Sequence, residues 1–293
     1  MGYLFLMIAL LTGATKGYCG KKISGYVSKP GDAFFMNLIR MVLCIGISFV
    51  TICFSGGIHT LIVEPRVLIL TALSGITTSA FVIVWVFCVQ KGAYMMVDVF
   101  LMLGCMIPIL SSTFLFKERL EIYDIIGFLL LVVAALVMCS YNNSIKAKMS
   151  FVAVGLLILC AVANGGSQLA QKLFAVEYPD GSVAAFNFYT YVFSALVLFI
   201  CRGIYNVKNH TTQKMEKSIV GYITIMAICL FANSFFLTLA AKSLHAVVLY
   251  PLDRGLSIVL SALMAAVFFK EKISIKCVIG MVLAFIGLLV INF

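Results

Sequence analysis

Long apolar runs separated by short polar connections fill most of the chain. A helix needs roughly 20 apolar residues to cross a hydrocarbon core of about 30 Å, because each residue adds about 1.5 Å. Ten segments meet or approach this length: residues 2–19, 33–54, 67–89, 93–116, 122–139, 151–170, 183–201, 219–241, 246–269 and 273–293. The pattern predicts an all-α membrane protein with ten transmembrane helices. No connection is long enough to hold a folded domain, so we expect the functional residues inside the membrane.

One segment of the chain occurs twice. Residues 116–138 reappear as residues 269–291, with nine of the 23 aligned positions identical, and both copies open with Phe-Lys-Glu. Such self-similarity indicates two related halves. The copies fall on predicted helices four and five and on nine and ten, so the halves are residues 1–144 and 145–293, each a five-helix repeat. Because five is odd, the second half enters the membrane from the opposite side, which predicts inverted repeats, an arrangement suited to alternating access.

Composition excludes several classes of protein. The chain is 63% hydrophobic and 11% charged, whereas a soluble domain has about 25% charged residues. Its ten cysteines form no Cys-x-x-Cys pair and have no histidine at ligand spacing, so we expect neither a metal site nor a cofactor. No hydrolase or metalloprotease motif is present, so we expect no catalytic residue and no enzyme. The net charge of +10 is typical of lysines in membrane-protein loops, and we expect no nucleic-acid partner.

Five ionisable residues fall within the predicted spans: Lys16, Arg40, Asp98, Asp253 and Arg254. A charge at membrane depth costs about 2.5 to 3.5 kcal/mol, so such residues are functional candidates by default. Lys16 lies near a span end, where snorkelling to the interface is an equally good explanation, and the same explanation applies to Arg40. Asp98, six positions into its span, has a better claim to a functional role, and Asp253 and Arg254, eight and nine positions into theirs, have the best.

Polar residues at helical spacing accompany these charges. On the ninth span Tyr250, Arg254, Ser257 and Ser261 form one stripe, next to Pro251. Similar stripes contain Asn164 and Gln168 on the sixth span and Asn187 and Tyr191 on the seventh. Each stripe alone is typical of hydrogen bonding between helices, and together they favour a shared hydrated cavity. The predicted substrate-binding residues are Lys16, Arg40, Asp98, Asn164, Gln168, Asn187, Tyr191, Tyr250, Asp253 and Arg254.

The sign of the buried charge narrows the substrate. Three cations face two anions, and the first and sixth spans contain no Asp or Glu. Our hypothesis is a small polar metabolite with an anionic or zwitterionic group, held by Arg254 with Lys16 or Arg40. Asp98 or Asp253 then acts as a salt-bridge partner or carries a coupling proton.

These features resemble the drug/metabolite transporter superfamily, in its ten-helix type with two EamA-like halves. The resemblance lies in Gly13-Ala14-Thr15-Lys16-Gly17, Arg40, Lys117-Glu118, Lys270-Glu271, Gly127 and Gly280. It implies secondary transport through a central cavity lined by both halves. Members carry amino acids, nucleotide sugars, phosphorylated sugars, choline-like compounds and drugs. The first span lacks the membrane-embedded glutamate of small multidrug relatives, which disfavours their mechanism of proton-coupled efflux.

Several alternatives stay open at this point. Loop lysines and arginines place both termini outside the cell, whereas the resemblance implies cytoplasmic termini; labelling a cysteine introduced at Lys214 distinguishes the two. Alternative functions are efflux of drugs or other organic solutes and a non-transporting membrane sensor. The expected partners are a small-molecule substrate, the lipid bilayer of the cell membrane, and a coupling proton or exchanged solute. The protein is expected to be a monomer or a homodimer.

Overall fold

The computed structural model describes residues 1–27, 29–90, 94–118, 121–139, 151–209, 217–269 and 275–291. These residues form helices and no strands, which confirms the all-α prediction for the described part of the chain. The elements are α1 (Gly2–Ser24), α2 (Pro30–Ser55), the 3₁₀ helix η1 (Ile58–Leu61), α3 (Pro65–Gln90), α4 (Tyr94–Gly104), α5 (Met106–Phe116), α6 (Ile122–Cys139), α7 (Phe151–Glu177), α8 (Val183–Asn209), α9 (Lys217–Ala241), α10 (Ala246–Phe269) and α11 (Ile275–Ile291).

The helix ends follow from local sequence. Pro30 occupies the first turn of α2, where its missing N–H costs nothing, and the Lys29 backbone N–H donates to Asp32 Oδ2 at 2.9 Å. Gly57 follows α2 with a φ of 80°, a left-handed conformation that favours glycine. The predicted fourth span is two helices, α4 and α5, which meet at Cys105. Pro108 provides the physical reason, because it has no N–H for the carbonyl of Gly104.

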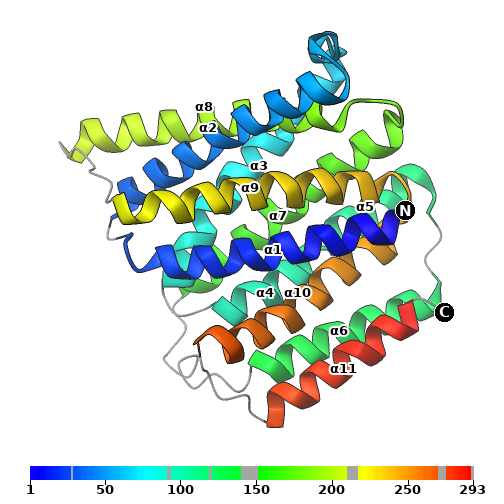
Figure 1. Ribbon diagram of the computed structural model, residues 1–293. Coiled ribbons are helices and arrows are strands. Elements are labelled where there is room, and N and C mark those ends of the chain that lie inside the picture. The colour runs from blue at the N-terminus through cyan, green and yellow to red at the C-terminus, as the bar shows by residue number, and fades with distance from the viewer. Residues whose placement is uncertain are drawn as a thin grey trace.

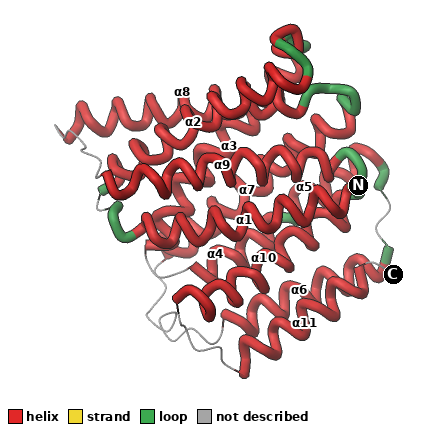
Figure 2. The backbone as a smooth tube through the Cα atoms, viewed as in Figure 1, coloured by secondary structure: helices red, strands yellow, loops and turns green. Residues whose placement is uncertain are grey.

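The helices lie side by side in one bundle (Figure 1). α2 packs on α8 at one edge and α6 on α11 at the other, while α1 packs on α9 and α3 on α7 between them. α1 begins and α11 ends at the same end of the bundle, which we call the N-terminal end. Apart from the turn at Cys105 between α4 and α5, the described loops lie at the two ends of the bundle (Figure 2). Segments far apart in the sequence therefore build its centre.

Five helices are long and apolar enough to cross a membrane by length and composition: Pro30–Ser55, Pro65–Cys88, Val154–Glu177, Val183–Asn209 and Ile219–Ala241. Shorter apolar helices cover Phe100–Phe116, Ile122–Ala134 and Val278–Gly287. Large apolar side chains also point outward, such as Phe199 on α8 and Leu129 on α6, which are 65% and 56% exposed. Such a surface suits lipid and not water.

A buried polar network joins α7, α8 and α9. Gln171 Nε2 donates to Ser234 Oγ at 2.9 Å, and Ser234 Oγ donates to Asn187 Oδ1 at 2.7 Å. We expect Ser234→Ala to destabilise the protein by about 1 kcal/mol, because the side-chain amides of Gln171 and Asn187 each lose a hydrogen-bond partner. The effect is no larger because individual hydrogen bonds inside membranes are weak. Thermal unfolding in detergent measures this. Thr224→Ala is the control on the same helix, since among the described residues the Thr224 hydroxyl donates only to Val220 O of α9. Equal effects of the two changes would contradict the prediction.

Candidate functional site

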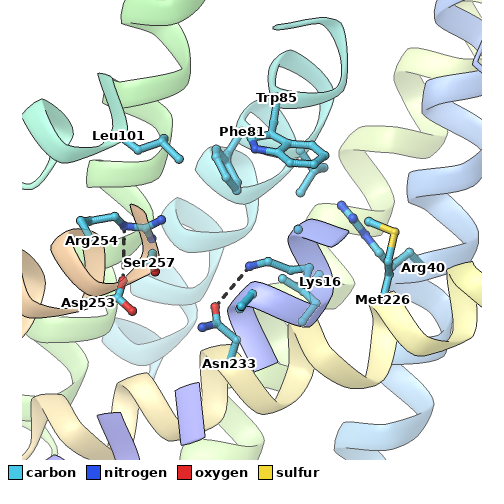
Figure 3. A pocket seen from close by; sticks show the side chains of 15 residues that line it. Lys16, Arg40, Phe81, Trp85, Leu101, Met226, Asn233, Asp253, Arg254 and Ser257 are labelled. Atoms are coloured by element: carbon cyan, nitrogen blue, oxygen red, sulfur yellow. Dashed lines mark hydrogen bonds and ion pairs between the residues drawn. The ribbon is translucent and has the colours of Figure 1, made fainter. Parts of the chain in front are cut away.

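A charged cavity lies at the centre of the bundle (Figure 3). It encloses about 740 Å³, including space open to the exterior, between side chains of α1, α2, α3, α4, α9 and α10. Its cations are Lys16, Arg40 and Arg254, and Phe81 and Trp85 of α3 form an aromatic wall. The rest of its lining is Gly13, Ala14, Gly17, Val82, Leu101, Met226, Leu230, Asn233, Asp253 and Ser257.

Lys16 of α1 is held by α9. The Asn233 side chain donates from Nδ2 to Ala9 O at 2.8 Å, and its Oδ1 accepts from Lys16 Nζ at 3.3 Å. Gly13 permits this approach, because a Cβ there would lie 3.2 Å from Asn233 Nδ2. The lysine ammonium is therefore oriented inside the cavity.

Arg254 of α10 has protein partners. Its Nε lies 3.3 Å from Asp253 Oδ2, and its Nη2 donates to Asn164 Oδ1 of α7 at 3.3 Å. The Asp253 side chain is 3% exposed and that of Arg254 is 18% exposed. The charge of this arginine is thus compensated within its own helix.

Arg40 of α2 is surrounded differently. It is 5% exposed, and its buried Nε has no hydrogen-bond partner. Contacts on either side fix its helix: Asn37 Nδ2 donates to Val82 O of α3 at 3.4 Å, and Cys44 Sγ donates to Ala227 O of α9 at 3.4 Å. A rigid backbone therefore places this guanidinium at the cavity.

A buried ion pair closes the N-terminal end of the bundle. Glu118, which follows α5, lies 2.9 Å from Lys172 Nζ of α7 through its Oε1. Its Oε2 accepts from the backbone N–H of Ala246, the first residue of α10, at 2.9 Å, and Lys172 Nζ donates to Leu244 O at 2.9 Å. One carboxylate thus fastens three chain segments together. We call Glu118, Lys172 and Ala246 the end clasp.

Other contacts support the same closure. Lys242, just after α9, donates to Pro179 O and Gly181 O at 2.6 and 2.9 Å. Burial lowers the pKa of Lys242, while the carboxylate of Asp180 raises it. Beneath these loops Leu6, Leu10, Leu249 and Tyr250 belong to one buried apolar cluster. This cluster separates the cavity from the N-terminal end.

Toward the opposite end the central cavity adjoins a smaller one. The smaller cavity encloses about 360 Å³, including open space, and shares Arg40, Trp85 and Met226 with the central cavity. It is lined by Ile23 and Ser24 at the end of α1 and by residues near the starts of α2 and α9. The space inside the bundle therefore continues toward one end, away from the end clasp, along a mostly apolar lining.

The predicted site residues divide into two groups. Lys16, Arg40, Asp253 and Arg254 line one cavity, and Asn164 touches it through Arg254. Four others are not among the lining residues and make contacts between helices: Gln168 O accepts from Tyr250 Oη at 2.9 Å, Tyr191 Oη donates to Leu230 O at 3.4 Å, and Asn187 bonds to Ser234. The side chain of Asp98 lies outside the described part of the structure.

Sequence reasoning missed several residues of the cavity and its closure. Asn233 and the aromatic wall carry no charge, although Trp85 is the single tryptophan of the chain. Lys172 lies beyond the predicted sixth span, residues 151–170, but it is 3% exposed within α7. Among the described residues no three His, Cys, Asp or Glu side chains gather as metal ligands.

The fold and cavity define a multi-pass helical membrane protein with a charged interior. The profile of the EamA-like transporter family matches residues 151–293. An uncharacterized membrane protein of Bacillus subtilis (strain 168), YvaE, is 30% identical over 98 residues, which are 32% of this chain and 82% of that protein. A solved crystal structure superposes with a TM-score of 0.79 at 16% identity, covering 99% of this chain and 95% of that one, and shows the fold alone. The chain belongs to the EamA-like transporter family, an EamA-type branch of the drug/metabolite transporter superfamily.

Proposed function

We propose that the protein is a secondary active transporter that moves a small anionic or zwitterionic metabolite across the cell membrane by alternating access. One observation carries the proposal: three cations, Lys16, Arg40 and Arg254, surround a single cavity inside an apolar helical bundle. Buried charges in a membrane protein mark substrate or ion pathways. A surplus of positive charge favours a substrate with a negative group and disfavours efflux of lipophilic cations.

Two features support alternating access between inverted repeats. The packing of the first half is matched by the second: α1 packs on α9 as α7 packs on α3, and α6 packs on α11. α6 begins and α11 ends at the N-terminal end, so these neighbours run in opposite directions (Figure 1). The cavity also extends away from the end clasp, as a one-sided state of such a transporter requires.

A membrane sensor is the second candidate function. A transporter moves its substrate across the membrane, whereas a sensor does not. The purified protein, reconstituted in proteoliposomes, is expected to carry a metabolite of this class saturably from one side to the other. A sensor binds the same ligand without flux. A metabolite panel is first screened by thermal stabilisation, because a ligand at 100 times its dissociation constant adds about 2.7 kcal/mol to the folded state.

Uptake is expected to depend on Arg254. Arg254→Ala removes a cation from the cavity and leaves Asp253, 2% exposed, without its ion-pair partner. Loss of a charged contact to the substrate weakens binding by about 1.5 to 3 kcal/mol, so we expect the KM of uptake to rise about tenfold or more. Arg66→Ala is the matched control, since Arg66 is exposed at the start of α3. Uptake equal to that of the parent would remove Arg254 from the proposed site.

A further inference from the structure

The cations of the cavity are not equivalent. Arg254 is engaged by Asp253 and Asn164. Arg40 makes no hydrogen bond or ion pair with the described residues, and its Nε is both buried and unpartnered. Lys16 has an uncharged partner, the Asn233 amide. Because a buried charge needs compensation, an anion gains the most binding free energy next to Lys16 and Arg40.

The two residues come from neighbouring helices and face the same space. Lys16 of α1 and Arg40 of α2 both line the central cavity, and both are fixed by contacts to α9, through Asn233 and through Cys44 respectively. Figure 3 shows the Lys16 and Arg40 side chains below the ring of Trp85. Two fixed cations on one side of a cavity suit a head group with two negative charges.

An aromatic wall adjoins this pair. Phe81 and Trp85 lie one turn apart on α3, so their rings share a face of the helix. The Trp85 indole lies against Gly20 of α1, where an added Cβ would be 2.6 Å from Trp85 Cη2. The ring thereby covers the space next to Arg40, with which it shares both cavities.

We infer that the cavity selects an organic dianion built on a flat ring. The doubly charged head, a phosphate monoester or a pair of carboxylates, lies between Lys16 and Arg40, and the ring stacks against Trp85 and Phe81. Arg254, already compensated by Asp253, contacts a neutral or zwitterionic part of the substrate. This inference rests on the proposed transport function and narrows its substrate class.

Simple probes test the inference on the purified full-length protein. Phenyl phosphate and phthalate carry both features, inorganic phosphate carries the head alone, benzoate has a ring with one charge, and benzyl alcohol has the ring alone. We expect phenyl phosphate and phthalate to bind at least about tenfold more tightly than any of the other three, since a charge-assisted contact and a stacked ring each contribute. Comparing phenyl phosphate with phthalate distinguishes a phosphate head from a dicarboxylate.

Single variants assign the two subsites. Arg40→Gln and Lys16→Gln are each expected to weaken phenyl phosphate binding about tenfold or more, and Arg66→Gln is the exposed control. Trp85→Leu is expected to reduce the preference for phenyl phosphate over inorganic phosphate about two- to tenfold and to leave inorganic phosphate binding unchanged. Without ligand, Arg40→Gln is expected to unfold at the same temperature as the parent or higher, because it removes an uncompensated buried charge.

Clear outcomes overturn the inference. The inference is wrong if benzylamine binds more tightly than phenyl phosphate, if benzoate and phthalate bind equally, or if Arg40→Gln binds phenyl phosphate as the parent does. A lower unfolding temperature of Arg40→Gln without ligand would show that Arg40 has a structural role instead. The proposed function fails separately. If phenyl phosphate binds through Arg40 but no flux is measured, the inferred binding site stands and the transport function is rejected. If another metabolite shows saturable flux that Arg40→Gln does not change, the inferred binding site is rejected and the transport function stands.

Discussion

Glu118→Gln is expected to lower the free energy of unfolding by about 3 kcal/mol. The carboxylate of Glu118 lies 2.9 Å from the Lys172 ammonium, and the side chains of the two residues are 10% and 3% exposed. Removing one partner of a buried pair leaves the other charge uncompensated, at a cost of about 3 to 5 kcal/mol. Glutamine preserves the shape of the side chain and an oxygen for the Ala246 N–H, so the effect reports the lost charge.

Thermal or chemical unfolding in detergent measures this loss, and a second change isolates its cause. Adding Lys172→Met to Glu118→Gln removes the lone charge, so we expect the double variant to recover much of the lost stability, as a coupled pair requires. Glu121→Gln is the matched control, because Glu121 is exposed in the same hairpin. A double variant that loses the sum of the two single effects would show that the end clasp is not a coupled pair.

The end clasp also bears on transport. It joins the segment after α5, the last turns of α7 and the start of α10 at the N-terminal end of the bundle. A contact that is made in one conformation and not in the other stabilises the first and so shifts the equilibrium toward it. If the protein alternates between conformations open to opposite sides of the membrane, as proposed, weakening the end clasp favours the conformation that is open at the N-terminal end.

The sequence predicted the helices better than the breaks within them. Long apolar runs reveal helices because every backbone polar group must be satisfied within the membrane. The division of the fourth span at Cys105 was not predicted, although Gly104 and Pro108 supplied the local signal. The position where a helix ends depends on such single residues, whereas the presence of a helix depends on the composition of a whole apolar run.

Charge placed the cavity residues more reliably than polarity did. Lys16, Arg40, Asp253 and Arg254 meet at one cavity, because an ionised group cannot face lipid cheaply. Uncharged polar stripes are compatible with either a cavity or a helix contact. Asn187, with its bond to Ser234 and no exposed surface, shows the second outcome. The end clasp was beyond sequence reasoning, because it pairs groups from separate segments.

Gly165→Leu is expected to destabilise the protein by about 3 kcal/mol or more and to disturb the cavity with it. At the crossing of α4 and α7 the two backbones touch: a Cβ on Gly165 would collide with Gly104 O, and a Cβ on Gly104 would lie 2.5 Å from Ala161 O. These obstacles are backbone carbonyls, which cannot swing aside as a side chain can. Overpacking of this kind forces helices apart.

The crossing also positions two parts of the site. Leu101 lies one turn before Gly104 and lines the cavity, and Asn164, next to Gly165, accepts from Arg254. We therefore expect Gly165→Leu to lower both the unfolding temperature and the affinity for any ligand of the cavity. Gly155→Leu is the control on α7, since Gly155 is exposed and no atom of the described residues lies within 4 Å of an added Cβ. Equal losses in the two variants would mean that leucine harms α7 in general, and that close approach of α4 to α7 does not support the cavity.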